Sequence, residues 1–274
     1  MKRMMAVVLA LFLVAWGGPA LAGPVILMGI DAEDGGPGGH GPISVYADVR
    51  DSLIGHVSRT NGGSGILVIG GGKSVFDSPT TFWDALSTGA NPVTYVNGAA
   101  AIGALTAASF SGKAMVAIVS DEFNTGNGLT NAENDALTPK GSLIAGFVNT
   151  GGALLGFSSV ALSDPYGYLA GGFGAFTFGS VFDSDITPTA AGLAVGITNS
   201  LDVCCWHDSY LTHPSYLSVL ATYPFSGDSV AALGGVFGLP GGPVLPGAVP
   251  EPGTVLLLGS GLAGLAAWRM RKKV

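Results

Sequence analysis

Residues 143–157 read LIAGFVNTGGALLGF, and we expect this stretch to join the end of a helix to a short apolar strand. Its first part has apolar side chains at helical spacing, namely Leu143, Ile144, Phe147 and Val148. Gly151 and Gly152 follow, and glycine supplies the left-handed conformation that often ends a helix. The apolar run at 153–157 is then a strand candidate. A helix that ends directly before a strand is typical of α/β proteins.

The same alternation of apolar runs and helix-like stretches continues on both sides of this segment. Residues 43–57 repeat apolar side chains every three or four positions, which predicts a helix with Asp48, Arg50 and Asp51 facing solvent. A second helical stretch, 131–149, contains Pro139, which we expect to divide it. The strand candidates are 25–30, 65–69, 93–96, 114–120 and 153–157, followed by 217–222 and 230–237. The pattern predicts one α/β domain over residues 23–238, with a mostly parallel sheet flanked by helices.

The N-terminus has the three parts of a secretory signal peptide. Basic Lys2 and Arg3 precede an apolar run at 6–16, and Ala20-Leu21-Ala22 forms a small-x-small cleavage site. The apolar run is shorter than the roughly 20 residues that span a bilayer, which disfavours a permanent N-terminal anchor. Residues 1–22 are therefore predicted to be a signal helix removed by signal peptidase.

The C-terminus also has three parts in fixed order. A Gly/Pro spacer at 239–248 leads to Pro250-Glu251-Pro252, whose prolines keep the backbone extended. The uncharged stretch 254–268 then predicts a short transmembrane helix, and a basic cluster at 269–273 follows it. Because Lys and Arg remain on the cytoplasmic side, the domain is expected outside the inner membrane.

This combination over residues 249–274 resembles the PEP-CTERM sorting signal of Gram-negative bacteria. The resemblance implies recognition by an exosortase-like sorting enzyme, cleavage near Pro250-Glu251-Pro252, and delivery to the cell surface or the extracellular space. It also implies an association with exopolysaccharide. A plain single-span anchor with a proline-rich stalk is the alternative interpretation, although the apolar stretch is short for a full span.

Composition narrows the class of partner. Hydrophobic residues make up 48% of the chain, which is enough to build a core. Between Gly23 and Pro250 there are 5 Lys and Arg against 17 Asp and Glu, a net charge of −12. Such a domain cannot neutralise a phosphate backbone, so nucleic acid is excluded as a partner and a divalent cation is favoured.

The adjacent Cys204 and Cys205 are expected to be buried apolar residues, with a vicinal disulfide as the alternative.

The central region resembles the class I glutamine amidotransferase-like fold, which is related to the flavodoxin-like architecture. The segments that carry this resemblance are Ile30-Asp31, Gly70-Gly71-Gly72, Leu129-Thr130, the run from Phe147 to Gly156, Ile186-Thr187-Pro188 and Gly192-Leu193. In that family a cysteine nucleophile follows a strand on a tight elbow. Here the corresponding residue is Ser158, and Val160 replaces the second glycine of the G-x-S-x-G pattern.

Ligands of open α/β sheets bind beyond the carboxyl ends of the strands, so the loops there hold the candidate site residues. Asp31, Glu33 and Asp34, followed by His40, form an oxygen-rich loop suited to Ca²⁺ or Mg²⁺, although its spacing is not that of an EF-hand. Asp121 would join them if strands 25–30 and 114–120 were neighbours. A solvated acidic turn is the alternative.

Two further loops suggest different chemistry. Gly70-Gly71-Gly72-Lys73-Ser74 ends like a P-loop, but Leu67 stands where its first glycine is required, so Lys73 is predicted only to hold an anion. Ser158 would need a histidine base to act as a nucleophile, and His207, beside Asp208, is the candidate.

Three functions are consistent with these features. The leading hypothesis is a non-catalytic surface protein whose degenerate amidotransferase-like domain binds a ligand, a cation or a polysaccharide. The rival is a secreted hydrolase that uses Ser158 with His207, or a metal. The third is a saccharide-binding protein whose aromatic side chains stack on sugar rings; the candidates are Trp83, Tyr166, Tyr168 and Trp206.

Overall fold

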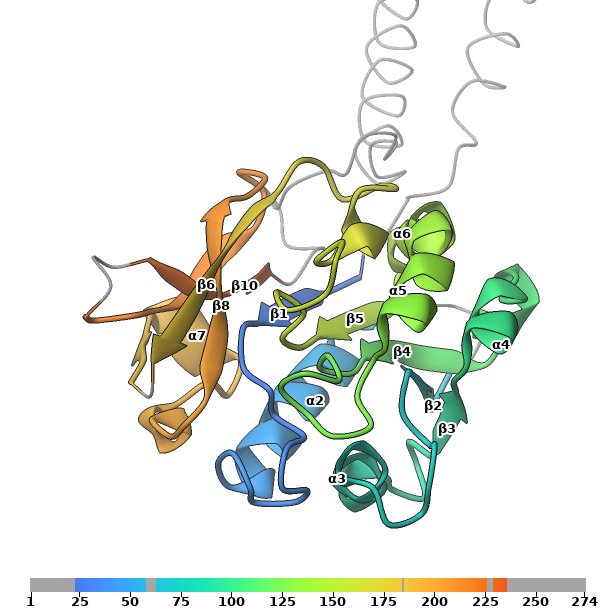
Figure 1. Cartoon of the computed structure of the whole chain (residues 1–274), viewed down its shortest axis with the longest axis horizontal. Helices are drawn as coiled ribbons and strands as arrows, with labels where there is room; N and C mark the ends of the chain where they lie inside the picture. Colours follow the sequence, from blue (N-terminus) through green and yellow to red (C-terminus); the bar gives the residue numbers. More distant parts are fainter. Residues whose placement is uncertain (1–22, 58–62, 184, 226–228, 236–274) are drawn as a thin grey trace, which may run out of the picture.

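The computed structural model of the chain describes residues 23–57, 63–183, 185–225 and 229–235. Their strands form an eight-stranded sheet in the order β3-β2-β4-β5-β1-β10-β9-β7, with a separate two-stranded sheet of β6 and β8 (Figure 1). The predicted signal peptide at 1–22, the spacer at 239–248 and the sorting segment at 249–274, including 254–268, all lie outside the described residues.

Five parallel strands make up one part of the large sheet, as the apolar runs predicted. They are β1 (Val25–Met28), β2 (Gly65–Ile69), β3 (Val93–Val96), β4 (Lys113–Ile118) and β5 (Ala153–Gly156). Every residue of β1, β2 and β5 is buried, which explains why these strands are apolar throughout instead of alternating.

Three antiparallel strands extend the sheet beyond β1. They are β10 (Val230–Gly235), β9 (Ser218–Thr222) and β7 (Thr187–Pro188). The fold is therefore mixed α/β with a mostly parallel sheet, and the prediction is correct at that level. The sequence pattern located the strands at 217–222 and 230–237 within one or two residues, but it did not predict their direction.

The two-stranded sheet was not predicted. It pairs β6 (Thr177–Asp183) with β8 (Trp206–Thr212), antiparallel and with two register irregularities. Strand β6 lies in the Gly- and aromatic-rich part of the sequence, and neither strand shows a clean alternation of apolar and polar residues. The omission matters because β8 contributes two residues of the candidate site.

Helices lie on both sides of the parallel strands. Helices α2 (Ile43–Gly55) and α3 (Ser78–Leu86) lie on one side, and α5 (Asn131–Leu137) and α6 (Gly141–Asn149) on the other (Figure 1). The 3₁₀ turn η2 (Thr138–Lys140) separates α5 from α6, as expected at Pro139. The remaining helices are short: α4 (Ala99–Gly103), α7 (Ala190–Ala194), η1 (Ala107–Phe110), η3 (Gly167–Leu169) and η4 (Asn199–Leu201).

The condition set for Asp121 is not met, and the expected orientation of Arg50 is corrected. Strand β5 lies between β1 and β4, so these two strands are not adjacent. Arg50 does not face solvent, because its side chain is 7% exposed and donates to the main-chain oxygen of Leu86 at the end of α3. Within the described ranges, no helix has the length and apolar character needed to cross a membrane.

Candidate functional site

Polar side chains are buried where the parallel strands end. Asp31 follows β1, Ser120 and Asp121 follow β4, and Ser158 follows β5; each is at most 2% exposed. Buried polar groups need partners, since leaving one unpaired costs about 1–3 kcal/mol. The partners of these side chains therefore show what the site can do.

Glu33 is the residue that links the loop after β1 to the end of β4. Its Oε2 accepts hydrogen bonds from the backbone N–H of Ser120 at 3.0 Å and from the Ser120 hydroxyl. Its Oε1 accepts from Trp83 Nε1 at 2.9 Å. Complete burial raises the pKa of Glu33 to about 7. The carboxylate is thus engaged by protein donors and is not presented to a ligand.

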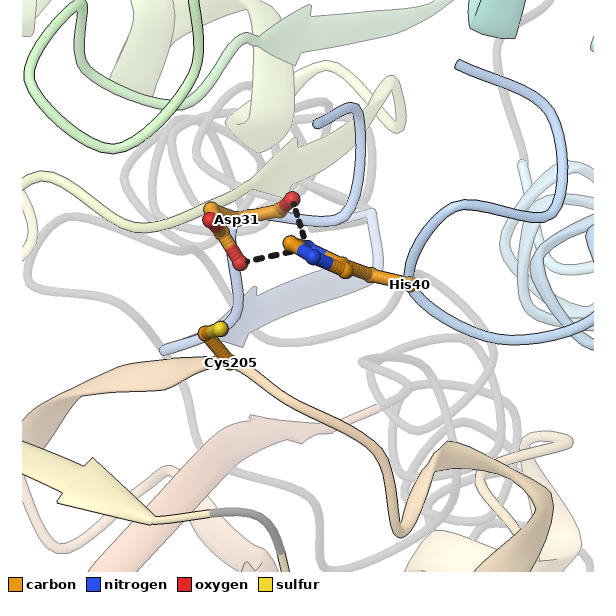
Figure 2. Close-up of side chains that lie close together, drawn as sticks. All are labelled: Asp31, His40 and Cys205. Carbon is orange, nitrogen blue, oxygen red and sulfur yellow. Dashed lines mark hydrogen bonds and ion pairs between the residues drawn. The ribbon is translucent and has the colours of Figure 1, made fainter. Parts of the chain in front are cut away.

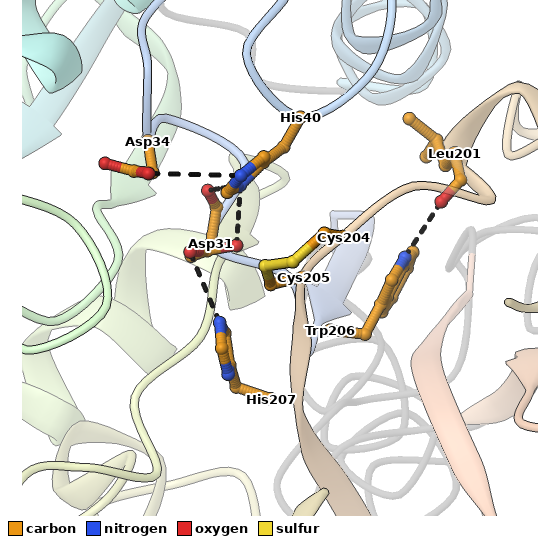
Figure 3. Close-up of a disulfide and its surroundings, with 8 residues drawn as sticks. All are labelled: Asp31, Asp34, His40, Leu201, Cys204, Cys205, Trp206 and His207. Carbon is orange, nitrogen blue, oxygen red and sulfur yellow. Dashed lines mark hydrogen bonds and ion pairs between the residues drawn. A yellow bond between two sulfur atoms is a disulfide. The ribbon is translucent and has the colours of Figure 1, made fainter. Parts of the chain in front are cut away.

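Asp31 lies between two imidazole rings (Figure 3). His40 Nδ1 is 2.8 Å from Asp31 Oδ1, and His207 Nε2 is 3.3 Å from Oδ2. The contact with this carboxylate raises the pKa of the His40 ring. The sequence placed His40 in the acidic loop, but the meeting of Asp31 with His207 depends on the position of β8.

The four carboxylates proposed as a cation site do not converge on one point. Asp34 is 43% exposed and lies 3.9 Å from His40 Nε2. Asp121 caps its own turn: it accepts from the backbone N–H of Phe123 and Asn124, both at 3.0 Å. Burial raises the pKa of Asp121. Of the four carboxylates, only Asp31 belongs to a cluster of metal-ligating side chains in the described ranges.

That cluster contains Asp31, His40 and Cys205, whose ligand atoms all lie within 4.8 Å of one another (Figure 2). Cys205 is joined to Cys204 in a disulfide (Figure 3). The expectation of two buried apolar cysteines is therefore corrected: Cys204 is exposed and Cys205 is only partly buried. The cluster was missed from the sequence because Cys205 lies more than 160 residues after the loop that holds Asp31 and His40.

Lys73 binds a carboxylate of the protein itself. Its Nζ is 2.6 Å from Oε2 of Glu133, which is 3% exposed, and it also donates to the main-chain oxygen of Gly128. Burial would raise the pKa of Glu133, but the bond from Lys73 and those from the backbone N–H of Thr130 and Gly98 lower it. The predicted anion site at Lys73 is thus occupied by Glu133, the residue that completes the capping box of α5.

Ser158 is not paired with His207. The Ser158 hydroxyl is fully buried and donates to Asp208 Oδ1 at 2.7 Å, whereas His207 contacts Asp31. The other oxygen, Asp208 Oδ2, accepts from the backbone N–H of Ser159 at 2.6 Å and of Val160 at 3.1 Å, and from the Tyr166 hydroxyl at 2.6 Å. Burial raises the pKa of Asp208 to about 7.

The side chains proposed to stack on sugars are part of the core. Trp83, Tyr166, Tyr168 and Trp206 are each at most 1% exposed. Both indole N–H groups also have internal acceptors, since Trp83 Nε1 donates to Glu33 and Trp206 Nε1 donates to the main-chain oxygen of Leu201 at 3.0 Å. None of these four rings is available to a saccharide in this structure.

In the part of the chain that the structure describes, the candidate side chains Glu33, Lys73 and Ser158 are paired internally, and Asp31, His40 and Cys205 form a mixed cluster. The comparison with known proteins adds a finding at the C-terminus. Residues 248–272 match the PEP-CTERM protein-sorting motif. This match includes Pro250-Glu251-Pro252 and supports an exported protein that is sorted by an exosortase. No curated protein and no solved structure matches the chain.

Proposed function

We propose that this chain is an exosortase-sorted envelope protein whose α/β domain acts at the cell surface without catalysing a reaction. The absence of catalysis is inferred from the burial of Ser158, which is 0% exposed and whose hydroxyl donates a hydrogen bond to Asp208. The first part rests on the sorting motif at 248–272.

A nucleophilic serine needs access to substrate and a base that accepts its proton in hydrogen-bond reach. Ser158 lacks access, and its proton is directed at a carboxylate whose other oxygen holds the elbow itself through Ser159 and Val160. Asp208 therefore maintains the turn after β5. This arrangement fixes the turn after β5 with Ser158 buried. It supports a domain that resembles the amidotransferase-like fold but does not catalyse the reaction of that family.

The ends of the chain complete the proposal. A signal peptide at 1–22 directs export, and the basic cluster at 269–273 holds the tail on the cytoplasmic side of the inner membrane. The extended Pro250-Glu251-Pro252 segment then enters the sorting enzyme. Cleavage there delivers the domain to the surface or the extracellular space, where exopolysaccharide is its expected surrounding.

Sorting is tested by expressing the chain in two matched strains, with and without an exosortase. In the exosortase strain we expect an intact mass that lacks the C-terminal tail and a protein accessible to external protease. Without the enzyme, and in a Pro250→Ala/Glu251→Ala/Pro252→Ala variant, the tail remains and the chain stays in the membrane fraction. Pro246→Ala, in the spacer, is the control. Equal processing in both strains would refute this part of the proposal.

The absence of serine chemistry is tested with a fluorophosphonate probe on the folded chain. We expect labelling of the wild type to equal that of Ser158→Ala, because the buried hydroxyl does not meet the probe. Ser163→Ala, which removes an exposed serine, controls for background. Labelling that disappears only in Ser158→Ala would restore the hydrolase hypothesis.

A further inference from the structure

We propose that Asp31, His40 and Cys205 form a zinc-type metal site that is closed while the Cys204–Cys205 disulfide is intact and becomes available when that disulfide is reduced. This inference goes beyond the proposed surface role and does not depend on it. Nor is it the calcium-type carboxylate site that the sequence suggested.

The three ligand types suit a borderline metal ion. Zinc binds cysteine thiolate, histidine nitrogen and carboxylate oxygen at about 2.0–2.3 Å, so ligand atoms around a tetrahedral ion lie roughly 3.5 Å apart. The ligand atoms of Asp31, His40 and Cys205 already lie within 4.8 Å of one another. Closing around an ion therefore needs side-chain movements of only about an ångström.

The burial of Asp31 and the few contacts of its Oδ1 favour a cation at this position. Its side chain is 2% exposed, and the buried Oδ1 accepts no hydrogen bond of ordinary geometry. The nearest opposite charge is the ring of His40, whose Nδ1 is 2.8 Å from Oδ1 and 3.0 Å from the main-chain oxygen of Asp31 (Figure 2). The ion contact with His40 is thus the one contact described for this buried oxygen, and buried carboxylate oxygens normally have more partners, so Oδ1 is placed to accept a metal bond.

The residues around the cluster orient its ligands as outer-shell groups do in metal sites. His40 turns Nδ1 towards Asp31, while its other nitrogen, Nε2, lies 3.9 Å from Asp34 Oδ2. His207 approaches the second oxygen of Asp31 at 3.3 Å (Figure 3). A ligating histidine whose second nitrogen faces a carboxylate is the usual arrangement. One carboxylate and one thiolate would neutralise the two charges of the metal ion.

The disulfide determines when the third ligand is available. A thiolate binds metal, whereas a disulfide sulfur has no proton to lose and is a poor ligand. A phosphine reductant cleaves the S–S bond and becomes a phosphine oxide with oxygen from water, and the two water protons end on Cys204 and Cys205. Cys205 then releases its proton to solvent as the metal–sulfur bond forms. Exposed Cys204 gives the reductant access.

The two cysteines make a matched pair for the test. The full chain is purified without reductant, treated or not treated with a water-soluble phosphine, desalted, and titrated with Co²⁺ and then Zn²⁺. We expect thiolate-to-cobalt charge-transfer absorption only after reduction. Cys204→Ser removes the disulfide but keeps the ligand, so it should bind one Co²⁺ without reductant. Cys205→Ser should lack this absorption and bind at least about 10-fold more weakly.

Further variants locate the site. Asp31→Asn and His40→Gln should weaken Zn²⁺ binding by at least about 10-fold in the Cys204→Ser background, whereas His56→Gln, on the exposed end of α2, should not. Circular dichroism confirms that each variant is folded. If folded Cys204→Ser fails to bind Co²⁺, or if Cys205→Ser keeps the charge-transfer absorption, the proposal is wrong. Because both cysteine variants lie outside the core, this result does not depend on Asp31→Asn folding.

Discussion

The hydroxyl of Ser158 donates a hydrogen bond to Asp208 at 2.7 Å, although the two residues are 50 positions apart in the sequence. This bond connects the turn after β5 to strand β8 of the small sheet. Asp208 also receives the backbone N–H groups of Ser159 and Val160, so a single carboxylate fixes the elbow. The relationship identifies Asp208 as a structural residue.

Replacing Asp208 with alanine should therefore destabilise the domain. The change leaves the buried donors of Ser158 and Ser159 without an acceptor, and we expect the free energy of unfolding to fall by about 3 kcal/mol. Urea denaturation measures the difference. The matched control is Asp48→Ala, at an exposed position of α2, which should change stability by about 0.5 kcal/mol or less. Equal effects of the two substitutions would contradict the role given to Asp208.

Stability should decrease as the pH rises towards neutrality. Burial raises the pKa of Glu33 from 4.5, and of Asp208 from 3.8, to about 7. Between these ordinary values and 7, the folded chain holds more protons than the unfolded chain, so the free energy of unfolding falls with increasing pH. The stabilisation is complete below the unfolded pKa values and is lost as the pH passes through about 7.

The measurement is the urea midpoint at about pH 5 and about pH 8, which we expect to be lower at the higher pH. Glu33→Gln and Asp208→Asn remove the titrating groups and should flatten the profile. A midpoint that rises with pH, or a slope that both variants retain unchanged, would show that these two carboxyl groups do not control it.

Lys73→Met should leave Glu133 as a buried, unpaired charge. Breaking a buried ion pair costs about 3–5 kcal/mol, and Lys73 is 21% exposed, so we expect a loss near the lower end, about 3 kcal/mol. Lys113→Met is the control, because Lys113 Nζ contacts only the hydroxyl of Thr94 among its described partners, at 2.7 Å. Adding Glu133→Gln to Lys73→Met should recover part of the loss. Similar effects of Lys73→Met and Lys113→Met would argue against the pair.

Gly72→Ala should distort the loop after β2. Gly72 has a φ of +78°, and a Cβ there would lie 2.4 Å from Cβ of Tyr95. The left-handed backbone costs about 1–2 kcal/mol for alanine, and the overlap adds about 1–3 kcal/mol. Gly89→Ala, where a Cβ meets nothing within 4 Å, should be nearly neutral. Thermal unfolding of the two variants measures the difference. Equal melting temperatures would contradict the predicted strain at Gly72.

The strands at 65–69 and 93–96 were predictable to the residue because their signals are local. Both are short runs bounded by glycine, proline or asparagine; 65–69 is apolar because it is fully buried, whereas the edge strand 93–96 is marked by the β-branched and aromatic residues typical of strands. Strands β6 and β8 were not predictable in this way. Their pairing is irregular, and polar and apolar residues do not alternate cleanly along either strand.

For the candidate site, too, the local features were predictable and the long-range contacts were not. The sequence located Asp31, Lys73, Asp121 and Ser158 in loops that follow strands, because the end of an apolar run is visible locally. It did not reveal that Glu33 accepts a hydrogen bond from Ser120, that Glu133 forms an ion pair with Lys73, or that Asp208 accepts the hydrogen bond of the Ser158 hydroxyl. Each of these partners is far away in the sequence, and no periodicity records which distant side chain meets which loop.

By itself, the sequence determined the α/β class, the positions of the five parallel strands and the sorting motif at 248–272, because each depends on the composition and order of neighbouring residues. Only the tertiary structure decided which polar groups are paired internally and that Asp31, His40 and Cys205 come together. The physical reason is that buried hydrogen bonds and ion pairs depend on strand order and loop path, which bring distant segments within bonding distance.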